Sequence, residues 1–286
     1  DLVDEDRPEL ESELQTQVGA GLQRLYTLQN PDGGWGWWAS DDSRPWLSAY
    51  VLFGLDMAAE AGFPVPADVL ENASSYLVGY LNQPVAAEAV SDANARAFIV
   101  HVLAERGSLV PSRAVRLYER RAAMSIEAKA FLALALAQVG ADQQSRVDGL
   151  MADIGAAAVQ SATGSHWAED EVDSWSMGGE TRTTAVVIYA LTRLDPTNAN
   201  IAPAVRWLMV ERREAHWETT QATAWAVLAL AERMRSTGEL EARYTYHVEL
   251  NQAELGKGEV SAANVDQPVT MTAPVAEMAA EGDNEL

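Results

Sequence analysis

The chain of 286 residues contains no cysteine. Disulfide bonds, thiolate metal ligands and a cysteine nucleophile are therefore excluded within it. Histidine is scarce as well: the four are His101, His166, His216 and His247, and no two of them stand at the spacing of a metal-binding pair. A zinc site of the usual histidine and cysteine type is therefore not expected.

Positive charge is also in short supply. Twenty lysines and arginines stand against 42 aspartates and glutamates, which gives a formal net charge of −22. Nucleic acids and anionic membranes both bind proteins through cationic surfaces, so neither is expected as a partner. Solubility is the simplest interpretation of the excess acid, and a highly saline habitat is an alternative.

Long hydrophobic runs are missing too. Without about 18 uninterrupted apolar residues, the sequence predicts no membrane-spanning helix. The opening residues, DLVDEDRPELESEL, are acidic and do not resemble a secretory signal peptide, so any targeting segment is expected outside this chain. An apolar fraction of 48% over 286 residues is enough for one large globular domain and a piece of another.

The pattern that is present is a repeated helix, tryptophan corner and second helix. Residues 206–232 show it most clearly, with an apolar run, a charged corner, Trp217 and a second apolar run that opens at Thr219. Similar units surround Trp35 and Trp167, and the second and third tryptophans are 50 residues apart. A period of that size indicates a repeated supersecondary unit.

Apolar spacings of three and four, together with glycine and proline stops, predict ten helices. They span Glu9–Gln29, Trp46–Ala61, Ala67–Leu81, Asp92–Arg106, Pro111–Arg121, Ser125–Val139, Gln143–Val159, Thr181–Leu194, Ile201–Arg213 and Thr219–Ser236. Asp92, Ser125 and Thr219 are the predicted N-caps. The connections are short, which favours antiparallel hairpins, and the nearly all-apolar helix around Phe131–Ala137 predicts an inner ring of helices inside an outer ring.

The pattern changes after Gly238. Residues Tyr244–Leu250 alternate with period two and predict a strand, Gly256-Lys257-Gly258 predicts a turn, and Val265–Thr272 predicts a second strand. So few strands cannot bury a sandwich core of their own. Residues 241–286 are therefore interpreted as a partial β-sandwich segment, with a tail, from a neighbouring module.

Three segments carry a family resemblance. They are Asp32-Gly33-Gly34-Trp35 followed by Trp46-Leu47-Ser48-Ala49-Tyr50-Val51-Leu52; His166-Trp167 followed by Glu180-Thr181; and Trp207-Leu208 followed by Trp217 and Thr219-Thr220-Gln221. In this order they resemble the thioester domain of the α2-macroglobulin and complement family. The likeness extends over residues 22–240.

The resemblance implies a mainly α fold, an α/α toroid of helical hairpins like that of terpenoid cyclases, inserted in a complement-type β-sandwich. Residues 1–240 would be the toroid without its first helices. The family's Cys-X-Glu-Gln thioester motif has no counterpart here, because there is no cysteine. The histidine that complement members use would fall near Tyr80–Ala93, which contains none, so the chain is more similar to the macroglobulin-like members.

The resemblance also implies a function. The chain would be a fragment of a broad-spectrum protease-trapping inhibitor, not an enzyme, and its helical body would move and dock when the trap closes. Its partners would be proteases, reached through the full-length parent, and neighbouring β-sandwich modules of the same chain. The location implied is extracellular, periplasmic or at the cell envelope, with no membrane contact by this fragment.

Two enzyme classes are the alternatives. A terpene cyclase or prenyltransferase shares the toroid and a corner like Gln29–Trp35, but the sequence lacks the Asp-X-Asp-Asp acid of cyclases and the cysteine of the prenyltransferase zinc set. An (α/α)-barrel carbohydrate-active enzyme would need paired carboxylates in its centre. The return to a strand pattern at Tyr244 favours the macroglobulin hypothesis over both.

No catalytic, cofactor-binding or metal-ligating residue is assigned from the sequence. Trp35, Trp37 and Trp38 could form a stacking platform for a carbohydrate or terpene, but packing at a helix corner is the favoured interpretation. The acidic cluster of Glu169, Asp170, Glu171 and Asp173 could hold a divalent cation or act as acid and base. A solvated loop is the favoured interpretation of that cluster.

Overall fold

The structure is a computed structural model that describes residues 8–84, 90–169, 178–239, 243–251, 253–261, 263–264 and 269–273. It is mainly helical, as predicted, with two small antiparallel sheets. The chain divides into two compact units, Pro8–Glu232 and one that contains the C-terminal β-hairpin, and each is described by itself.

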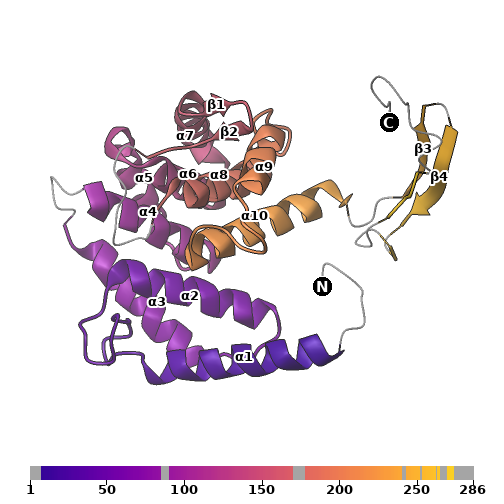
Figure 1. Cartoon of the computed structure of the whole chain (residues 1–286). Helices are drawn as coiled ribbons and strands as arrows, with labels where there is room; N and C mark the ends of the chain where they lie inside the picture. The colour runs from indigo at the N-terminus through magenta and orange to yellow at the C-terminus, as the bar shows by residue number, and fades with distance from the viewer. Residues whose placement is uncertain are drawn as a thin grey trace. The chain divides into compact units, whose positions relative to one another are not determined.

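Within the described ranges, ten α-helices appear where the sequence predicts them (Figure 1). They are α1 (Pro8–Thr27), α2 (Pro45–Glu60), α3 (Ala67–Asn82), α4 (Val90–Glu105), α5 (Pro111–Tyr118), α6 (Ile126–Val139), α7 (Gln144–Ala156), α8 (Glu180–Leu194), α9 (Ile201–Val210) and α10 (Thr220–Thr237). Two short 3₁₀ turns, η1 (Arg121–Ala123) and η2 (Ala141–Gln143), lie in the α5–α6 and α6–α7 connections. The hairpin prediction is thus confirmed, with boundaries that differ by a few residues.

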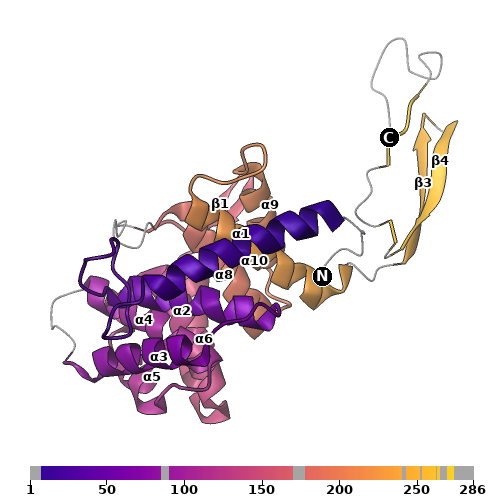
Figure 2. The same ribbon diagram turned by 90° about the horizontal axis from the view of Figure 1, so that it is seen from below.

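The even-numbered helices form the inside of the helical unit. Helices α2, α4, α6 and α8 pack side by side in succession, while α3, α5, α7 and α9 each pack against the outside of one or two of them (Figures 1 and 2). On α6 every residue from Ala130 to Leu136 is buried, and on α8 every residue from Thr181 to Thr192 is buried. A helix with neighbours on all sides cannot present a polar face, which explains the continuous apolar sequence of α6.

Aromatic rings fill the centre where the inner helices meet. Trp225 of α10 lies 5.4 Å from Phe53 of α2, 6.4 Å from Phe98 of α4, 5.3 Å from Phe131 of α6 and 6.0 Å from Tyr189 of α8, measured between ring centroids. One tryptophan therefore contacts every other inner helix. Edge-on and offset contacts of this kind add about 0.5–1.5 kcal/mol per pair beyond the burial of their area.

The three tryptophan corners are buried, as predicted. Trp35, Trp167 and Trp217 are 2%, 0% and 4% exposed. In each corner the indole N–H donates to a backbone carbonyl near the end of the preceding helix. The acceptors are Leu25, Ile154 and Leu208, at 2.9, 2.8 and 2.7 Å.

The backbone N–H of each corner tryptophan has an equally regular partner. It donates to a hydroxyl on the helix that follows. The acceptors are Ser48, Thr184 and Thr223, at 2.8, 3.1 and 3.0 Å. Each tryptophan thus joins two helices through two hydrogen bonds, and its buried polar atoms are satisfied, as a buried corner requires.

The loop of the first corner is held by hydrogen bonds to Asp32 and by the close approach of Gly33 to α3. The Asp32 carboxylate accepts from the Gly34 N–H at 3.0 Å and from the Ser43 hydroxyl at 2.6 Å, which closes the loop. Gly33 has a φ of +92°, and a Cβ there would lie 2.3 Å from the Asn72 carbonyl oxygen of α3. Only glycine fits this position, because both the φ and the close approach exclude a side chain.

A short hairpin in the second corner was not predicted. Strands β1 (Val159–Ser161) and β2 (Gly164–His166) pair antiparallel, so the sequence prediction that α7 reaches Val159 is wrong at its end. Gly164 has a φ of +139°, and a Cβ there would lie 2.1 Å from the Pro203 carbonyl of α9. The hairpin forms because this glycine lets β2 lie directly against α9.

The second unit contains strands β3 (Tyr244–Leu250) and β4 (Ala253–Val260), paired antiparallel. Strand β3 matches its prediction. The turn predicted at Gly256-Lys257-Gly258 is wrong, because these residues lie inside β4. The predicted strand Val265–Thr272 is also wrong in its described part, since 269–272 have no regular structure, and its first four residues lie outside the described residues.

Two of the three predicted N-caps are confirmed. The Ser125 hydroxyl accepts from the Ala128 N–H at 3.1 Å, and the Thr219 hydroxyl accepts from the Ala222 N–H at 3.0 Å. Asp92 is not a cap, because α4 begins at Val90. Its carboxylate instead pairs with Arg96 one turn later, at 2.9 Å.

The tryptophan corners make a testable prediction about Thr184. Thr184→Val leaves the buried Trp167 N–H without its acceptor, so the free energy of unfolding should fall by about 1–3 kcal/mol, measured by denaturant unfolding. Thr192→Val is the matched control on the same helix, because the Thr192 hydroxyl is buried and has no hydrogen-bond partner among the described residues. It should leave stability unchanged or raise it, and equal losses in both variants would contradict the role of the Thr184 hydroxyl.

Candidate functional site

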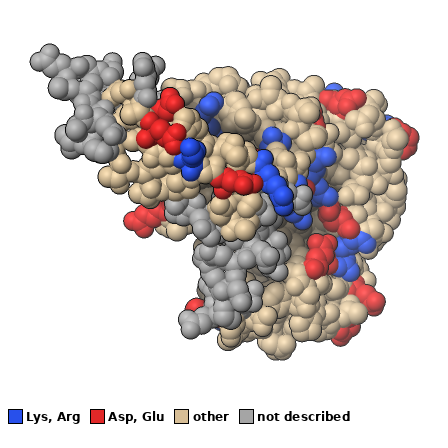
Figure 3. All heavy atoms as spheres, turned by 90° about the vertical axis from the view of Figure 1, so that its right-hand side faces the viewer, with Lys and Arg blue, Asp and Glu red and all other residues tan. Residues whose placement is uncertain are grey.

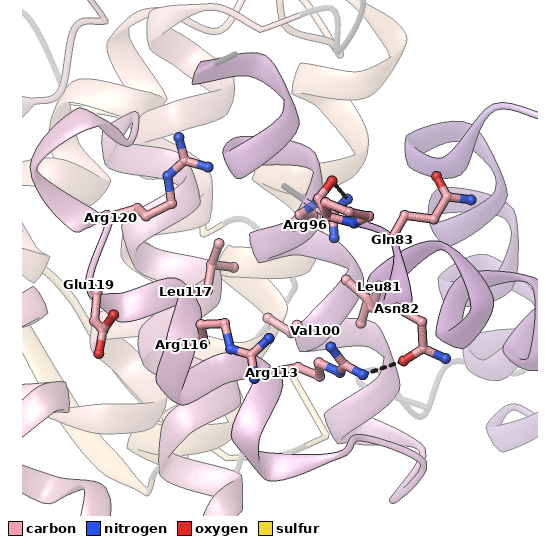
Figure 4. A pocket seen from close by; sticks show the side chains of 11 residues that line it. Leu81, Asn82, Gln83, Arg96, Val100, Arg113, Arg116, Leu117, Glu119 and Arg120 are labelled. Carbon is pink, nitrogen blue, oxygen red and sulfur yellow. Dashed lines mark hydrogen bonds between the residues drawn. The ribbon is translucent and has the colours of Figure 1, made fainter. Parts of the chain in front are cut away.

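A pocket of about 510 Å³ opens between the end of α3, the middle of α4 and the whole of α5 (Figure 4). Its walls combine apolar side chains with amides and arginines. The lining residues are Leu81, Asn82, Gln83, Pro84, Arg96, Val100, Arg113, Arg116, Leu117, Glu119 and Arg120. Four guanidinium groups at one pocket are unusual in a chain with so few cations.

The amphipathic sequence of α5 brings three of these arginines to the pocket. Ala114 and Leu117 face inward and are buried. Arg113, Arg116 and Arg120 follow one another at spacings of three and four residues, which places them along one side of α5 and its C-terminal end. In Figure 4 the side chains of Arg113 and Arg116 extend in the same direction, toward Asn82, while Glu119 lies on the other side of the view.

The arginines differ in how far their charge is already neutralised. Arg96 is 4% exposed; it pairs with Asp92 and lies over the Tyr80 ring, 4.5 Å from its centroid. Arg113 donates to the Asn82 side-chain oxygen, a neutral acceptor. Arg116 is exposed and has no hydrogen-bond or ion-pair partner among the described residues.

Basic and acidic side chains lie close to one another on the surface of the described residues. Figure 3 shows acidic and basic side chains next to one another on one face of the molecule. Exposed ion pairs of this kind contribute little to stability. The pocket is distinguished by its cavity and by Arg113 and Arg116, which make no ion pair with a described residue.

The exposed aromatic loop departs from the sequence interpretation. Trp35 packs at its corner, but Trp37 and Trp38 are 39% and 76% exposed. Corner packing is therefore wrong for these two side chains. Sequence spacing could not reveal this, because both follow the buried tryptophan directly in an irregular loop.

The acidic cluster is also only partly a solvated loop. Glu169 is half-buried, and its carboxylate accepts from the backbone N–H groups of Ile126 and Glu127 at 3.1 and 3.0 Å. It thus caps the N-terminus of α6, where a negative charge is favourable. Burial nevertheless raises the pKa of this carboxyl. Asp170, Glu171 and Asp173 lie outside the described residues.

A buried ion pair next to this cap was not anticipated from the sequence. Arg182 of α8 is 1% exposed and donates to the Glu127 carboxylate at 2.6 Å. Its guanidinium also lies 5.4 Å from the centroid of the Trp46 ring. Removal of one partner from such a pair costs about 3–5 kcal/mol, which makes the pair structural.

The four histidines lie in four different settings. His166 stacks on Trp207 at 4.7 Å between ring centroids, the His216 Nδ1–H donates to the Trp217 carbonyl at 2.8 Å, and His247 pairs with Glu254 at 2.8 Å. Within the described residues there is no group of three His, Asp or Glu side chains that could hold a metal ion. No described helix is both long and apolar enough to cross a bilayer.

The comparisons with known proteins agree on one family. Residues 2–85 match the model of the A-macroglobulin TED domain. The chain is 38% identical over 64 residues to α2-macroglobulin of Thermotoga maritima, and 37% identical over 68 residues to that of Escherichia coli K12. These matches cover 22% and 23% of this chain and 4% of each relative. The chain fits the TED region of a bacterial α2-macroglobulin.

Solved structures extend the TED likeness to most of the chain. Escherichia coli α2-macroglobulin activated by porcine elastase superposes with a TM-score of 0.64 at 21% identity, over 89% of this chain and 23% of that one. Salmonella α2-macroglobulin reacted with methylamine superposes with a TM-score of 0.68 at 20% identity, over 86% of this chain and 16% of that one. Identities this low show the shared TED fold alone. The chain spans only a small part of each relative.

His101 gives the helical unit a buried titratable group. It lies fully buried on α4, stacked on Phe131 at 5.4 Å, and neither ring nitrogen has a hydrogen-bond partner among the described residues. Burial lowers its pKa to about 4; Glu105, 3.9 Å away, opposes this shift, and Arg193 of α8 adds to it. The imidazole is therefore neutral at pH 7.

The low pKa of His101 makes the free energy of unfolding depend on pH. Between about pH 6.5 and pH 4 the unfolded chain binds a proton at His101 that the folded chain rejects, so stability falls with falling pH, by about 3 kcal/mol in total. Unfolding of His101→Leu should lose this part of the slope, whereas the exposed-corner variant His216→Gln should keep it. Asp56, whose pKa burial raises to about 6, acts in the opposite direction but equally in all three proteins. Parallel curves for wild type and His101→Leu would contradict the assignment.

Proposed function

We propose that this chain belongs to a protein that traps proteases in the manner of an α2-macroglobulin, and that its helical unit is the body that moves and docks when the trap closes. The observation that carries the proposal is the fold likeness to bacterial α2-macroglobulins over 86–94% of the chain. The family-model match to residues 2–85 supports it from the sequence side. In this function the chain is not an enzyme.

The filled centre of the helical unit supports a non-enzymatic role. Toroid and barrel enzymes place their reacting groups in a central cavity, and here Phe98, Phe131 and Trp225 occupy the middle. Each is at most 2% exposed. The only imidazole in this cluster, His101, is sealed from solvent and has no polar partner among the described residues. This arrangement disfavours both the terpene-cyclase alternative and the carbohydrate-active one.

The proposal includes a domain organisation. Residues 1–240 form the toroid of the thioester-domain type, and 241–286 belong to a β-sandwich module that neighbouring parts of the same protein complete. The isolated β3–β4 hairpin supports this, because two strands alone are marginally stable. The proposal also includes proteases as the partners of the whole protein and an extracellular, periplasmic or cell-envelope location, which the bacterial relatives support.

Inhibition assays test the trapping function. The longer protein that carries this chain with its neighbouring modules should block trypsin-like and elastase-like cleavage of a large protein substrate, while cleavage of a small peptide substrate continues, because a trap encloses the protease without filling its cleft. The 286-residue chain alone should leave both activities unchanged at micromolar concentration. A tight inhibitor needs a preformed anchor for the cleft, and trapping needs the other modules.

Each of the two inhibition assays has an outcome that would contradict the trapping proposal. Stoichiometric inhibition by the 286-residue chain would show that it carries its own inhibitory surface, and the proposal would be replaced. Failure of the longer protein to protect a large substrate from any protease tested would exclude trapping.

A second assay tests the absence of covalent chemistry in this chain. Incubation with methylamine should add no mass to the intact protein and release no thiol, because a thioester requires a cysteine and the chain has none. Salmonella α2-macroglobulin, whose structure has been determined after reaction with methylamine, is the matched positive control. A stoichiometric amine adduct on this chain, seen by intact-mass spectrometry, would overturn the prediction.

A further inference from the structure

The arginine-lined pocket is unexplained by protease trapping. The chain carries 20 cationic residues against 42 acidic ones, yet four arginines line one cavity, and among the described residues that line it Glu119 is the one carboxylate. Like charges brought together raise the free energy of the folded state unless something neutralises them. Arg96 pairs with Asp92, and Arg120 takes part in another interaction, so Arg113 and Arg116 are the two cations here that favour an anionic partner.

Within the described part of the chain, no acidic side chain pairs with Arg113 or Arg116. Asp92 neutralises Arg96 at 2.9 Å. Arg113 is held only by the neutral amide of Asn82, and Arg116 has no partner in the described ranges. Guanidinium groups recognise phosphate and carboxylate through paired hydrogen bonds, so two of them one helical turn apart form a site for an oxyanion.

One wall of the cavity is apolar, which favours an organic ligand over an inorganic ion. Leu81, Val100 and Leu117 line the same cavity, and all three are buried. Its volume of about 510 Å³ falls in the range of small-molecule pockets, roughly 300–1,000 Å³. An occupant that matches both walls has a compact apolar body and an anionic head group.

We propose that this pocket, at the junction of α3, α4 and α5, binds a small organic oxyanion. Its phosphate or carboxylate group lies against Arg113 and Arg116, and its apolar body lies against Leu81, Val100 and Leu117 (Figure 4). This binding is independent of protease trapping. The structural alternative is that Arg116 only stabilises the C-terminus of α5 through the helix dipole, a contribution of about 0.3–1 kcal/mol.

Phenyl phosphate is a suitable probe, because it joins a phosphate to a compact apolar ring. Isothermal titration into the 286-residue chain should show saturable binding of about one molecule per chain in the micromolar to millimolar range. Phenol, which lacks the charge, should not bind measurably, and inorganic phosphate, which lacks the ring, should bind more weakly. Added salt should weaken the binding of phenyl phosphate.

Charge variants locate the site. Arg113→Gln and Arg116→Gln should each weaken phenyl phosphate binding about tenfold or more, because each removes charge-assisted hydrogen bonds. Arg206→Gln is the matched control: Arg206 is an exposed arginine on α9, also without a partner among the described residues, and its loss should leave the affinity unchanged. Circular dichroism and thermal unfolding of every variant confirm that the fold is kept.

The outcomes separate the two explanations of the arginines. Absence of saturable phenyl phosphate binding by the wild-type chain overturns the proposal. Binding that Arg206→Gln weakens as much as Arg116→Gln does also overturns it, because the anion would then respond to general charge. A loss of thermal stability in Arg116→Gln together with unchanged affinity would leave the helix-dipole role as the explanation.

Discussion

The structure depends on the packing of the inner helices around a single buried tryptophan. Trp225 of α10 touches rings from α2, α4, α6 and α8, so the registers of five helices are constrained by one side chain. Truncation of a buried ring of this size costs about 3–5 kcal/mol, a large fraction of the stability of a typical domain. The same packing fills the centre of the helical unit with buried rings.

Burial of the inner helices imposes a second requirement, on polar groups. Backbone N–H groups and charges that enter this interior must find partners, since an unpaired one costs about 1–3 kcal/mol. The corner tryptophans meet the requirement through their doubled hydrogen bonds, Glu169 meets it at the start of α6, and Arg182 pairs with Glu127. His101, Thr192 and Trp225 itself are among the exceptions: their side-chain polar atoms are buried without hydrogen-bond partners in the described part of the chain, which lowers the stability of the fold.

The outer surface, unlike the apolar interior, carries charged side chains and also exposed aromatic rings. The chain carries an excess of acidic residues, whereas the pocket beside α5 is lined by four arginines. The exposed pair Trp37 and Trp38 adds an apolar surface in the first corner loop. The pocket and the two tryptophans belong to different elements of the helical unit.

The sequence by itself determined the number and place of the helices, the three buried corners and the position of β3, because these depend on local periodicity, capping residues and turn chemistry. Ser125, Thr219 and Trp217 could be interpreted correctly from their neighbours in the chain alone. Only the tertiary structure decided the rest: the pairing of Arg182 with Glu127, the cap that Glu169 provides 43 residues from Ile126, and the meeting of Arg96 with α5. Such contacts join residues far apart in sequence. No local pattern encodes them, because they arise only when packing brings separate helices to within hydrogen-bond distance.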